Sequence, residues 1–430
     1  MSNKKLQYHI LVFGCQMNFS DGEKLEKILI DLGYKKSPDE DSADIIAVVA
    51  CSIRKSAIDR VYGKAHIWKK RRRSGKLKTI LAGCVLDYDK KKLSSLFDFV
   101  VDIKDLAQLK KILSGTKATT RRKSYLSLPG EMNSNFQASV PIMTGCNNFC
   151  SYCVVPYTRG REKSRPAKAI VEECQKLIKK GYKEIFLLGQ NVNSYQSGKY
   201  SFPQLLKKVD EIKALPAEAS LGAKEEDFWL RFSTSHPKDL SDNLLAVMKN
   251  GKHITPYLHL AVQSGDDKIL EAMNRKYTVK HFLEIIAKAR KAMPEVMIST
   301  DVIVGFPGES KKQFENTIKL FKKAEFDMAY ISEFSPRKGT VAGKLKDDVS
   351  KIEKSKRKEE LNELLKKTAL KHNQKYIGRT VKVLVEKFKS GQCLGKTDTY
   401  KTVVFFGDKK LVGEFVEVKI NKVGSWVLYG

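Results

Sequence analysis

Cysteines are the residues of this chain best suited to chemistry, and three of its eight lie close together. Cys146, Cys150 and Cys153 occur in the segment TGCNNFCSYC, after a predicted strand at 139–145. Three thiolates within eight residues can converge on one metal centre, and iron–sulfur clusters are normally held by cysteine thiolates. A structural zinc site needs four ligands, and no histidine is nearby. The spacing therefore favours an iron–sulfur cluster over zinc or cysteines that only pack in a core.

A second group of cysteines is far apart in the sequence but similar in position. Cys15, Cys51 and Cys84 each follow the end of an apolar strand pattern. If these strands are parallel, the three thiols emerge at one edge of the sheet, where α/β folds place their ligands. The alternative is that they are ordinary buried cysteines. Cys174 and Cys393 have no cysteine neighbours and are expected to be structural.

The elements that must position these cysteines fall into three predicted domains. Residues 1–115 alternate β-branched runs with amphipathic helices, which indicates a Rossmann-like parallel α/β domain. A polar, basic linker is expected at 116–137. Residues 138–372 contain six strand candidates separated by helices, two fewer than a closed barrel needs, so a partial (β/α)6 barrel is predicted.

The last part of the chain changes character. A long charged helix is predicted at 348–375, and short alternating strands separated by glycines follow it. This pattern predicts a small antiparallel β domain at 373–430, a barrel or, as the alternative, a sandwich. The fold class is therefore a multidomain α/β protein with a C-terminal β domain.

Charge and hydropathy restrict the partners and the location. Lys and Arg number 80 against 49 Asp and Glu, a net charge of +31. Such an excess predicts a polyanionic partner such as nucleic acid; the alternative is a generally lysine-rich surface. No apolar stretch approaches the roughly 20 residues of a membrane span, and the short N-terminal apolar run does not form a signal peptide. A cytoplasmic protein without membrane contacts is expected.

One basic segment combines charge with an aromatic ring. The stretch 64–78 holds eight Lys or Arg residues and no acid. Phosphates and an unpaired base could be contacted by Arg71, Arg72, Arg73 and Trp68. The alternative is a solvated helix end with Trp68 packed inward.

Longer motifs give this chain a family resemblance. The string TGCNNFCSYCVVPYTRGREKSRP, with FGCQMNFSD, ACSIRKSA, LAGC and LHLAVQSGDDKILEAMNRKYT, resembles the radical S-adenosylmethionine (SAM) methylthiotransferase family, especially its tRNA-modifying MiaB branch. The resemblance covers nearly the whole chain and includes a TRAM-like C-terminal domain. The chain departs from the family pattern at Val49-Ala50, at 85–87 and at Ala261, but all six cysteines of the two groups are present.

The resemblance implies two 4Fe–4S clusters. One, on Cys146, Cys150 and Cys153, would bind SAM and cleave it to a 5′-deoxyadenosyl radical. The other, on Cys15, Cys51 and Cys84, would carry or donate sulfur, and a second SAM would supply the methyl group.

Further residues are candidates for contacts to SAM or RNA. Gln190, Asn191, Ser235, Gln263 and Asp301 fall near the carboxyl ends of predicted strands, the active-site face of a β/α barrel, although each could be a simple turn or cap. Tyr152 joins them as a SAM candidate. Arg159 and Arg161, close to the SAM-binding cysteines, are candidates for RNA contact rather than simple surface charge.

The resemblance also implies an activity and partners. The expected reaction adds a methylthio group to carbon 2 of N(6)-isopentenyladenosine at tRNA position 37. Alternatives are a threonylcarbamoyladenosine tRNA methylthiotransferase, a ribosomal-protein aspartate methylthiotransferase, and a non-catalytic iron–sulfur RNA-binding protein. A monomer is expected, with the tRNA anticodon loop, an electron donor such as flavodoxin or ferredoxin, and a sulfur donor as partners.

Overall fold

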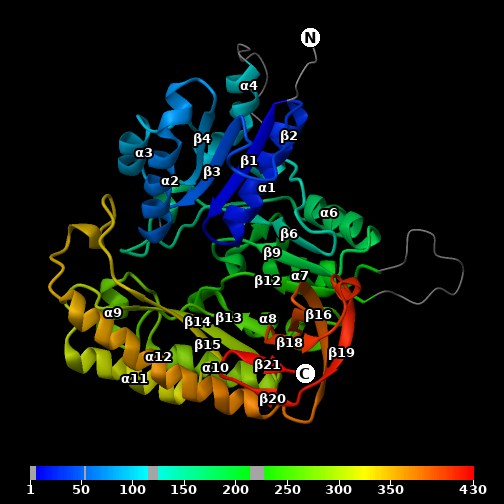
Figure 1. Cartoon of the computed structure of the whole chain (residues 1–430). Coiled ribbons are helices and arrows are strands. Elements are labelled where there is room, and N and C mark those ends of the chain that lie inside the picture. The colour runs from blue at the N-terminus through cyan, green and yellow to red at the C-terminus, as the bar shows by residue number, and fades with distance from the viewer. Residues whose placement is uncertain (1–5, 53–54, 115–123, 214–226) are drawn as a thin grey trace, which may run out of the picture.

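The chain forms three regions that follow one another in sequence (Figure 1). The structure is a computed structural model that describes residues 6–52, 55–114, 124–213 and 227–430. An N-terminal α/β region stands over a central barrel, and the C-terminal β region lies against the side of that barrel. Residues 116–123 of the predicted linker, including Arg121, Arg122 and Lys123, lie outside the described residues.

The N-terminal region is a parallel five-stranded sheet in the order β2-β1-β3-β4-β5. Its central strand β3 is a wholly buried β-branched run, because helices cover both faces of the sheet. The Rossmann-like prediction is confirmed. The elements are β1 Gln7–Phe13, α1 Gln16–Asp31, β2 Lys35–Lys36, β3 Ile45–Cys51, α2 Lys55–Arg73, β4 Lys78–Cys84, α3 Asp87–Leu93, β5 Phe99–Val100, η1 Ile103–Gln108 and α4 Leu109–Ser114.

Part of the predicted linker packs into this region. Tyr125 and Leu126, in the short helix η2 (Tyr125–Ser127), are buried in the core that α1 makes with the sheet. The Lys24 ammonium donates a hydrogen bond to the Leu128 carbonyl at 2.6 Å. The chain therefore returns to the N-terminal core before it enters the barrel.

The central region contains the six predicted parallel strands. Backbone hydrogen bonds join them into two three-stranded sheets, β12-β9-β6 and β13-β14-β15, and isolated bridges Leu230–Ile254 and Ser235–Leu260 connect the two halves. The partial barrel is confirmed. Its strands are β6 Gln137–Pro141, β9 Glu184–Leu188, β12 Trp229–Phe232, β13 Tyr257–His259, β14 Met297–Val304 and β15 Met328–Glu333.

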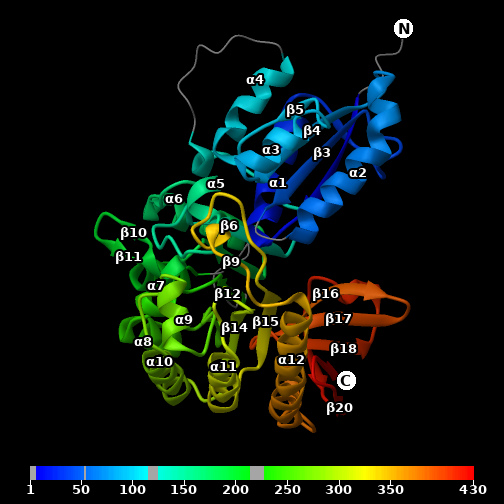
Figure 2. The ribbon, with the colours of Figure 1, turned by 90° about the vertical axis from the view of Figure 1, so that its left-hand side faces the viewer.

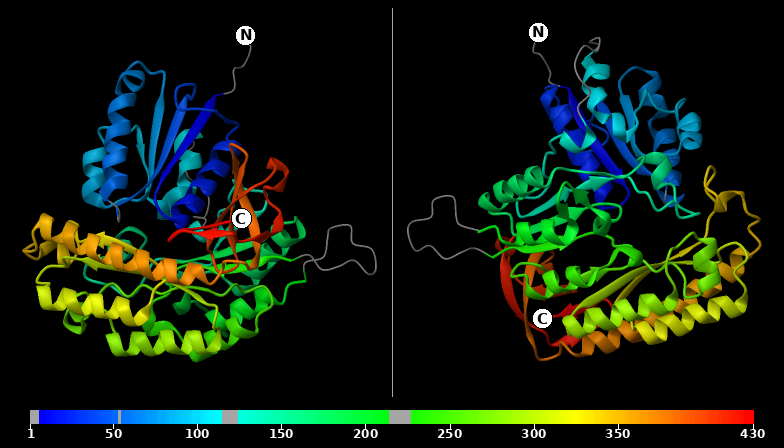
Figure 3. Two further views of the ribbon diagram at one scale, coloured as in Figure 1. Left: turned by 60° about the horizontal axis from the view of Figure 1, so that its bottom comes forward. Right: turned by 180° about the vertical axis from the view of Figure 1, so that it is seen from behind.

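Helices cover the outer face of the barrel, and α10, α11 and α12 lie side by side in one layer (Figures 2 and 3). Their apolar sides form one core with the strands. The predicted helix at 348–375 is α12, capped by Ser350, whose hydroxyl accepts from the Glu353 N–H. The helices are α5 Val155–Thr158, α6 Ala167–Lys179, α7 Phe202–Asp210, α8 Asp242–Asn250, α9 Asp267–Ala272, α10 Val279–Ala292, α11 Lys311–Ala324 and α12 Lys351–Gln374.

Short strands and 3-10 turns complete the central region. They are β7 Met143–Thr144, β8 Lys163–Ser164, η3 Val192–Ser194, β10 Gln196–Ser197, β11 Tyr200–Ser201, η4 Pro237–Asp239 and η5 Ala342–Lys344. The β7–β8 pair is antiparallel and brackets the cysteine-rich loop at 146–153.

The C-terminal region is a six-stranded sheet in the order β19-β16-β17-β18-β21-β20. One pair, β18–β21, is parallel rather than antiparallel, because the chain crosses to the far edge as β19 before it returns. The elements are β16 Thr380–Lys389, β17 Gln392–Thr397, β18 Thr402–Phe406, η6 Lys409–Leu411, β19 Phe415–Lys419, β20 Lys422–Val423 and β21 Val427–Tyr429.

The turn between β17 and β18 closes one end of the barrel. Arg231 of β12 is 1% exposed and pairs with Glu184 of β9 at 2.5 Å. Its guanidinium also donates to the carbonyls of Thr397 and Asp398 at 2.8 and 2.6 Å. The Tyr400 ring stacks on Tyr257, with ring centroids 4.7 Å apart. The C-terminal region is thereby fixed to the barrel by buried polar bonds and ring contacts.

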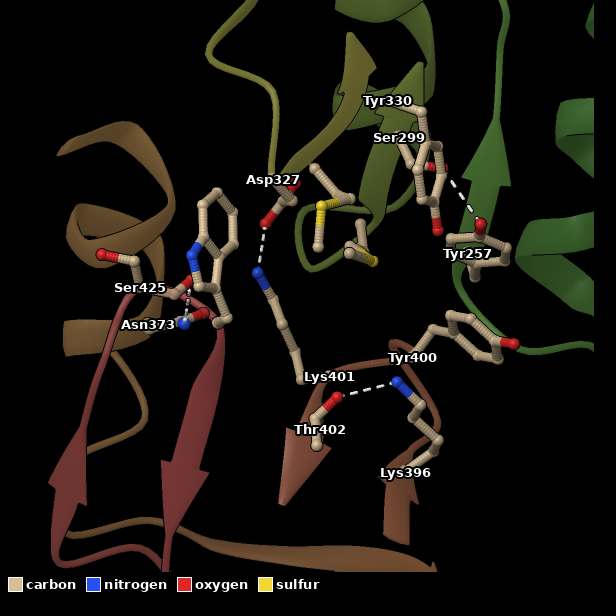
Figure 4. Close-up of a pocket in the computed structure, with 13 residues that line it drawn as sticks. Tyr257, Ser299, Asp327, Tyr330, Asn373, Lys396, Tyr400, Lys401, Thr402 and Ser425 are labelled. Atoms are coloured by element: carbon tan, nitrogen blue, oxygen red, sulfur yellow. Dashed lines mark hydrogen bonds and ion pairs between the residues drawn. The ribbon is translucent and has the colours of Figure 1, made fainter. Parts of the chain in front are cut away.

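A small cavity remains at this junction (Figure 4). The Lys401–Asp327 ion pair, 2.7 Å long, crosses it, and Tyr257 bonds Ser299 on its barrel side. At about 50 Å³ the cavity has room for one or two water molecules, not for a nucleobase or SAM. It is therefore part of the domain junction and not the reaction site.

Candidate metal centres

Hydrogen bonds to the turn that follows α9 hold the loop with Cys146, Cys150 and Cys153. The Ser151 N–H donates to the Met273 carbonyl at 3.0 Å, and the Ser151 hydroxyl donates to the Ala272 carbonyl at 2.8 Å. The Asn274 amide donates to the Phe149 carbonyl at 3.0 Å. These bonds fix a short irregular loop in which Phe149 has a φ of +48°. The loop backbone therefore holds the three cysteines at defined positions.

A close backbone approach fixes the start of the same loop. Gly145 has a φ of +78°, and a Cβ there would lie 2.2 Å from the Arg161 carbonyl oxygen. The Cys146 N–H donates to the Gly160 carbonyl at 3.3 Å. Only glycine fits at this position, so residues 160–161 are tied directly to the first cysteine.

A buried arginine lies against the central cysteine of the loop. Arg275 is 7% exposed, and its guanidinium donates to the Cys150 sulfur at 3.5 Å. It also donates to the Ala261 carbonyl and, at 2.9 Å, to the Tyr277 hydroxyl. Among the described residues no carboxylate pairs with it, so its charge faces the thiol group.

The other three cysteines meet at the carboxyl edge of the N-terminal sheet. Cys51 ends β3, Cys84 ends β4, and the two are paired in register, while Cys15 caps α1 just after β1. A hydrogen bond from Cys51 and the nearby Arg159 guanidinium lower the pKa of the Cys84 thiol to about 7 against the opposing effect of burial. Burial and the neighbouring Cys84 raise the pKa of Cys15. The parallel strands thus bring together three thiols that are distant in sequence.

The side-chain chemistry of both cysteine groups is that of iron–sulfur ligands. Among the residues that the structure describes, no three Cys, His, Asp or Glu side chains are grouped tightly enough to hold one metal ion. Iron–sulfur clusters are held by cysteine thiolates. The thiols are within electrostatic range of one another, since burial and then Cys150 raise the pKa of Cys153 to about 12. Three thiols are a donor set that fits an iron–sulfur cluster.

Cys174 and Cys393 lie apart from both groups. Cys174 lies on the buried face of α6 in the main core, and Cys393 is buried in β17.

The SAM candidates lie on the barrel, and several have protein partners. Both polar atoms of the Asn191 side-chain amide form hydrogen bonds. Its oxygen accepts from the His236 N–H at 3.0 Å, and its nitrogen donates to Asp239 at 2.6 Å. Ser235 donates to the Asn193 side-chain oxygen at 3.1 Å. These contacts position the strand-end loops that surround the barrel opening.

The remaining SAM candidates differ in exposure. His259 approaches one oxygen of Asp301 at 3.1 Å, and the Asp301 side chain remains 39% exposed. Gln263 is 8% exposed with a φ of +73°, and its backbone bridges to β14. Gln190 is half-buried. Tyr152 packs against an apolar cluster of Ile269, Met273, Phe306, Phe334 and Ala342.

Two of the RNA candidates are buried, which makes the prediction of RNA contact wrong for them. Trp68 is 3% exposed, donates to Glu40 at 3.1 Å and packs edge-on against Phe97. The Arg159 side chain is 1% exposed and pairs with Asp21. The amphipathic period of α2 turns the Trp68 ring into the core, and Asp21 supplies the counter-ion that allows Arg159 to be buried.

The other RNA candidates remain at the surface to different degrees. Arg71 donates to the carbonyls of Glu40 and Ala43, and Arg72 donates to that of Ser95. Arg73 and Arg161 are exposed. The Arg161 guanidinium lies over the Phe149 ring, 4.2 Å from its centroid.

Several residues around the cysteines could not be assigned to these sites from the sequence. Asn18, Asp21, Tyr125 and Arg275 all contact a cysteine or a residue that does, and each is buried. Only Asn18 carried a local signal, because a polar residue three positions after a helix-capping Cys15 can form a capping box. The others depend on chain segments distant in sequence.

Comparison with known proteins places each region. Residues 7–103 match a model described as uncharacterized protein family UPF0004, residues 140–321 match the radical SAM superfamily, and residues 374–430 match the TRAM domain. Curated relatives are named tRNA-2-methylthio-N(6)-dimethylallyladenosine synthase. Those of Thermoanaerobacter sp. (strain X514) and Carboxydothermus hydrogenoformans are each 39% identical, over 99% and 96% of this chain and 93% and 96% of their own.

Solved structures share the fold at low identity. The radical SAM methyltransferase TsrM of Kitasatospora setae aligns with a TM-score of 0.57 and 13% identity, over 78% of this chain and 75% of that one. The cobalamin-dependent radical SAM enzyme OxsB aligns with a TM-score of 0.51 and 10% identity, over 79% and 55%.

The fold and the two cysteine groups define a radical SAM enzyme with an added N-terminal α/β domain and a TRAM domain. The chain belongs to the radical SAM methylthiotransferase family, in the MiaB branch of tRNA methylthiotransferases. Its cofactors are SAM and 4Fe–4S clusters. No helix in the described part of the chain is both long and apolar enough to cross a bilayer.

Proposed function

We propose that this enzyme adds a methylthio group to carbon 2 of N(6)-isopentenyladenosine at tRNA position 37. The observation that carries this proposal is the presence of two separate three-cysteine groups, joined by the Arg159–Gly160 segment that contacts both. The names of the curated relatives support the isopentenyl substrate. The domains that divide the work are 1–115, the linker 116–137, the radical SAM core 138–372 and the TRAM-like domain 373–430.

In this proposal Cys146, Cys150 and Cys153 hold the cluster that binds SAM. When bound, that cluster and SAM supply the radical that removes hydrogen from the substrate carbon. The loop bonds to Ala272, Met273 and Asn274 fix the cysteines, and the buried Arg275 offsets negative charge at Cys150. The chain's own part is to orient the reacting groups and to exclude water from them.

Cys15, Cys51 and Cys84 would hold the second cluster, the source of the transferred sulfur. Met17, two residues after Cys15, packs against Phe186 and Leu188 on the inner side of β9. This contact brings the N-terminal cysteine edge against the barrel. The second cluster would therefore face the space in which the substrate base reacts.

SAM would be held by residues at the barrel opening. Gln190, Gln263, Asp301 and Tyr152 are the proposed direct contacts, because the hydrogen bonds of Asn191 and Ser235 are largely satisfied within the protein. Asp301 offers an exposed carboxylate whose orientation is fixed by His259.

The tRNA would approach over the cysteine-rich loop. Phe149 and Tyr157 pack edge to face beside Arg161, and Tyr157 is 49% exposed. An exposed aromatic ring beside an arginine is suited to stacking on an unpaired loop base. Arg73, the partly exposed Arg71 and Arg72, and the basic C-terminal domain would contact phosphates.

The remaining partners follow from this chemistry. One-electron reduction of the SAM-binding cluster needs a donor such as flavodoxin or ferredoxin, and continued turnover needs a sulfur donor. A tRNA substrate is consistent with a cytoplasmic monomer.

Two experiments test the proposal. Mass spectrometry of tRNA nucleosides from a strain lacking this gene should show loss of 2-methylthio-N(6)-isopentenyladenosine, and complementation should restore it. The purified, reconstituted enzyme should modify isopentenylated tRNA but not threonylcarbamoylated tRNA. An unchanged nucleoside profile, or modification of only the threonylcarbamoyl substrate, would contradict the assignment.

A further inference from the structure

Arg159 extends from the cysteine-rich loop of the core into the N-terminal cysteine group. Its Nε–H donates to the Cys84 sulfur at 2.8 Å, and its terminal nitrogens pair with the Asp21 carboxylate. The side chains of Arg159 and Asp21 are 1% and 0% exposed. A residue of the core therefore supplies a hydrogen-bond donor to a cysteine of the N-terminal domain.

The bond to Cys84 belongs to a buried network that holds the guanidinium in place. Tyr125 donates to Asp21, and the Asn18 amide donates to Asp21 at 3.1 Å. The same Asn18 amide approaches the Cys84 sulfur at 3.7 Å, and Cys15 donates to the Asn18 oxygen at 3.4 Å. Asp21 fixes the guanidinium while its Nε–H is left for the sulfur, so the donor is pre-organised.

The neighbouring residue performs the matching task at the other group. The Gly160 carbonyl accepts from the Cys146 N–H at 3.3 Å. Two consecutive residues thus contact both cysteine groups, one through a side chain and one through a carbonyl. A second core arginine, Arg337, lies within electrostatic reach of Cys51 and Asp89.

We propose that Arg159 is a positioning residue that orients the N-terminal cluster and raises its reduction potential. This inference rests on the proposed second cluster at Cys15, Cys51 and Cys84. Hydrogen bonds to the sulfur ligands of a cluster withdraw electron density and raise the potential. The bond comes from the core, so the potential of the N-terminal cluster depends on the docking of the two domains.

The test uses the full chain with Cys146, Cys150 and Cys153 replaced by alanine, so that only the N-terminal cluster can form. This parent is reconstituted anaerobically with iron and sulfide. Its iron content and its midpoint potential, followed by electron paramagnetic resonance during a redox titration, are compared with those of variants. A parent with about four irons per chain supports the second cluster. A parent without iron removes the second cluster from the proposed function and overturns this inference with it.

The decisive variants separate charge from geometry. Arg159→Gln combined with Asp21→Asn removes both charges without leaving one buried alone, and Arg159→Lys keeps the charge but loses the Nε–H. We expect the midpoint potential to be lower in both variants and the paramagnetic signal to be altered. The decrease in potential should be larger in the double variant. Lys168→Gln, which removes an exposed charge on α6 away from both cysteine groups, is the control and should leave the potential and the signal unchanged.

Each outcome decides the proposal. A double variant that retains iron with an unchanged potential and signal contradicts it, because a merely structural role would not move the potential. If the double variant fails to take up iron, Arg159→Lys decides: an unchanged potential there also contradicts the proposal, and a lowered one supports it.

Discussion

The two cysteine groups of this enzyme are built in opposite ways. Cys146, Cys150 and Cys153 lie in one loop and are positioned by short backbone bonds. Cys15, Cys51 and Cys84 come from three chain segments and are brought together by the register of parallel strands. One site is a property of a loop, whereas the other is a property of a sheet.

The two groups also differ in how their charge is balanced. Each has a buried arginine that donates to one sulfur, Arg275 to Cys150 and Arg159 to Cys84. Arg159 has Asp21 as a counter-ion, whereas Arg275 has no carboxylate partner among the described residues. A buried charge normally needs a partner. Arg275 therefore faces the Cys150 sulfur and neutral oxygens, whereas the charge of Arg159 is balanced within the protein.

The largest expected effect separates the roles of the two groups. Cys84→Ala should abolish methylthio transfer but preserve reductive cleavage of SAM, because the cluster proposed at Cys146, Cys150 and Cys153 remains. Cys150→Ala should abolish both. Liquid chromatography of 5′-deoxyadenosine, with iron counting on each variant, measures this. Cys174→Ala is the control, and equal loss of SAM cleavage in the two site variants would contradict the division.

The charge difference predicts stability changes of opposite sign in the cluster-free chain. Arg159→Gln should lower the free energy of unfolding by about 3–5 kcal/mol, because it leaves Asp21 buried without a partner. Arg275→Gln should leave it unchanged or raise it by about 1–2 kcal/mol, because an unpaired buried charge is removed. Urea unfolding measures both. The Arg275 variant should also retain less iron after reconstitution, and a loss of stability as large as that of Arg159→Gln would refute the comparison.

The surface next to the core site should affect RNA rather than the cluster. Arg161→Gln should raise the KM for tRNA several-fold, because it removes an exposed cation from beside Phe149, while kcat for SAM cleavage without tRNA stays the same. Steady-state kinetics on tRNA distinguishes the two. Lys168→Gln, which alters an exposed charge on α6, is the control. An unchanged KM for tRNA would exclude this surface as the approach route.

The smallest effect concerns the helix that begins at the N-terminal site. Burial raises the pKa of Glu23 on α1 from 4.5 to about 7, despite the Asn133 N–H that donates to it at 3.3 Å. The raised pKa has no effect on the free energy of unfolding below about pH 4.5. Its destabilising effect grows above that pH and is complete once the pH has risen through about 7. Glu23→Gln should therefore be more stable than the native chain at pH 8.5, by at least about 1 kcal/mol, and lose this advantage as the pH falls toward 4.5. Urea unfolding at the two pH values measures it, and a pH-independent difference would contradict the cause.

Much of the architecture could be predicted from sequence because local patterns define it. The buried run of β3 and the alternation with helices predict a parallel sheet, and the six strands of the core follow the same logic. The β18–β21 pairing was not predictable, because parallel pairing within a small β domain depends on where the returning chain enters the sheet. Burial of Trp68 was also undecided by composition, since a basic helix can turn its aromatic ring either way.

The sequence alone determined that both groups consist of cysteines. It also determined the loop spacing of Cys146, Cys150 and Cys153 and the placement of Cys15, Cys51 and Cys84 after strands. Only the tertiary structure decided that Arg159 is a buried partner of Cys84 rather than an RNA contact, and that Arg231 fixes the C-terminal turn to the barrel. The physical reason is distance along the chain. Contacts within a loop or strand follow from local backbone preferences, whereas a contact between segments 75 residues apart exists only when two domains pack.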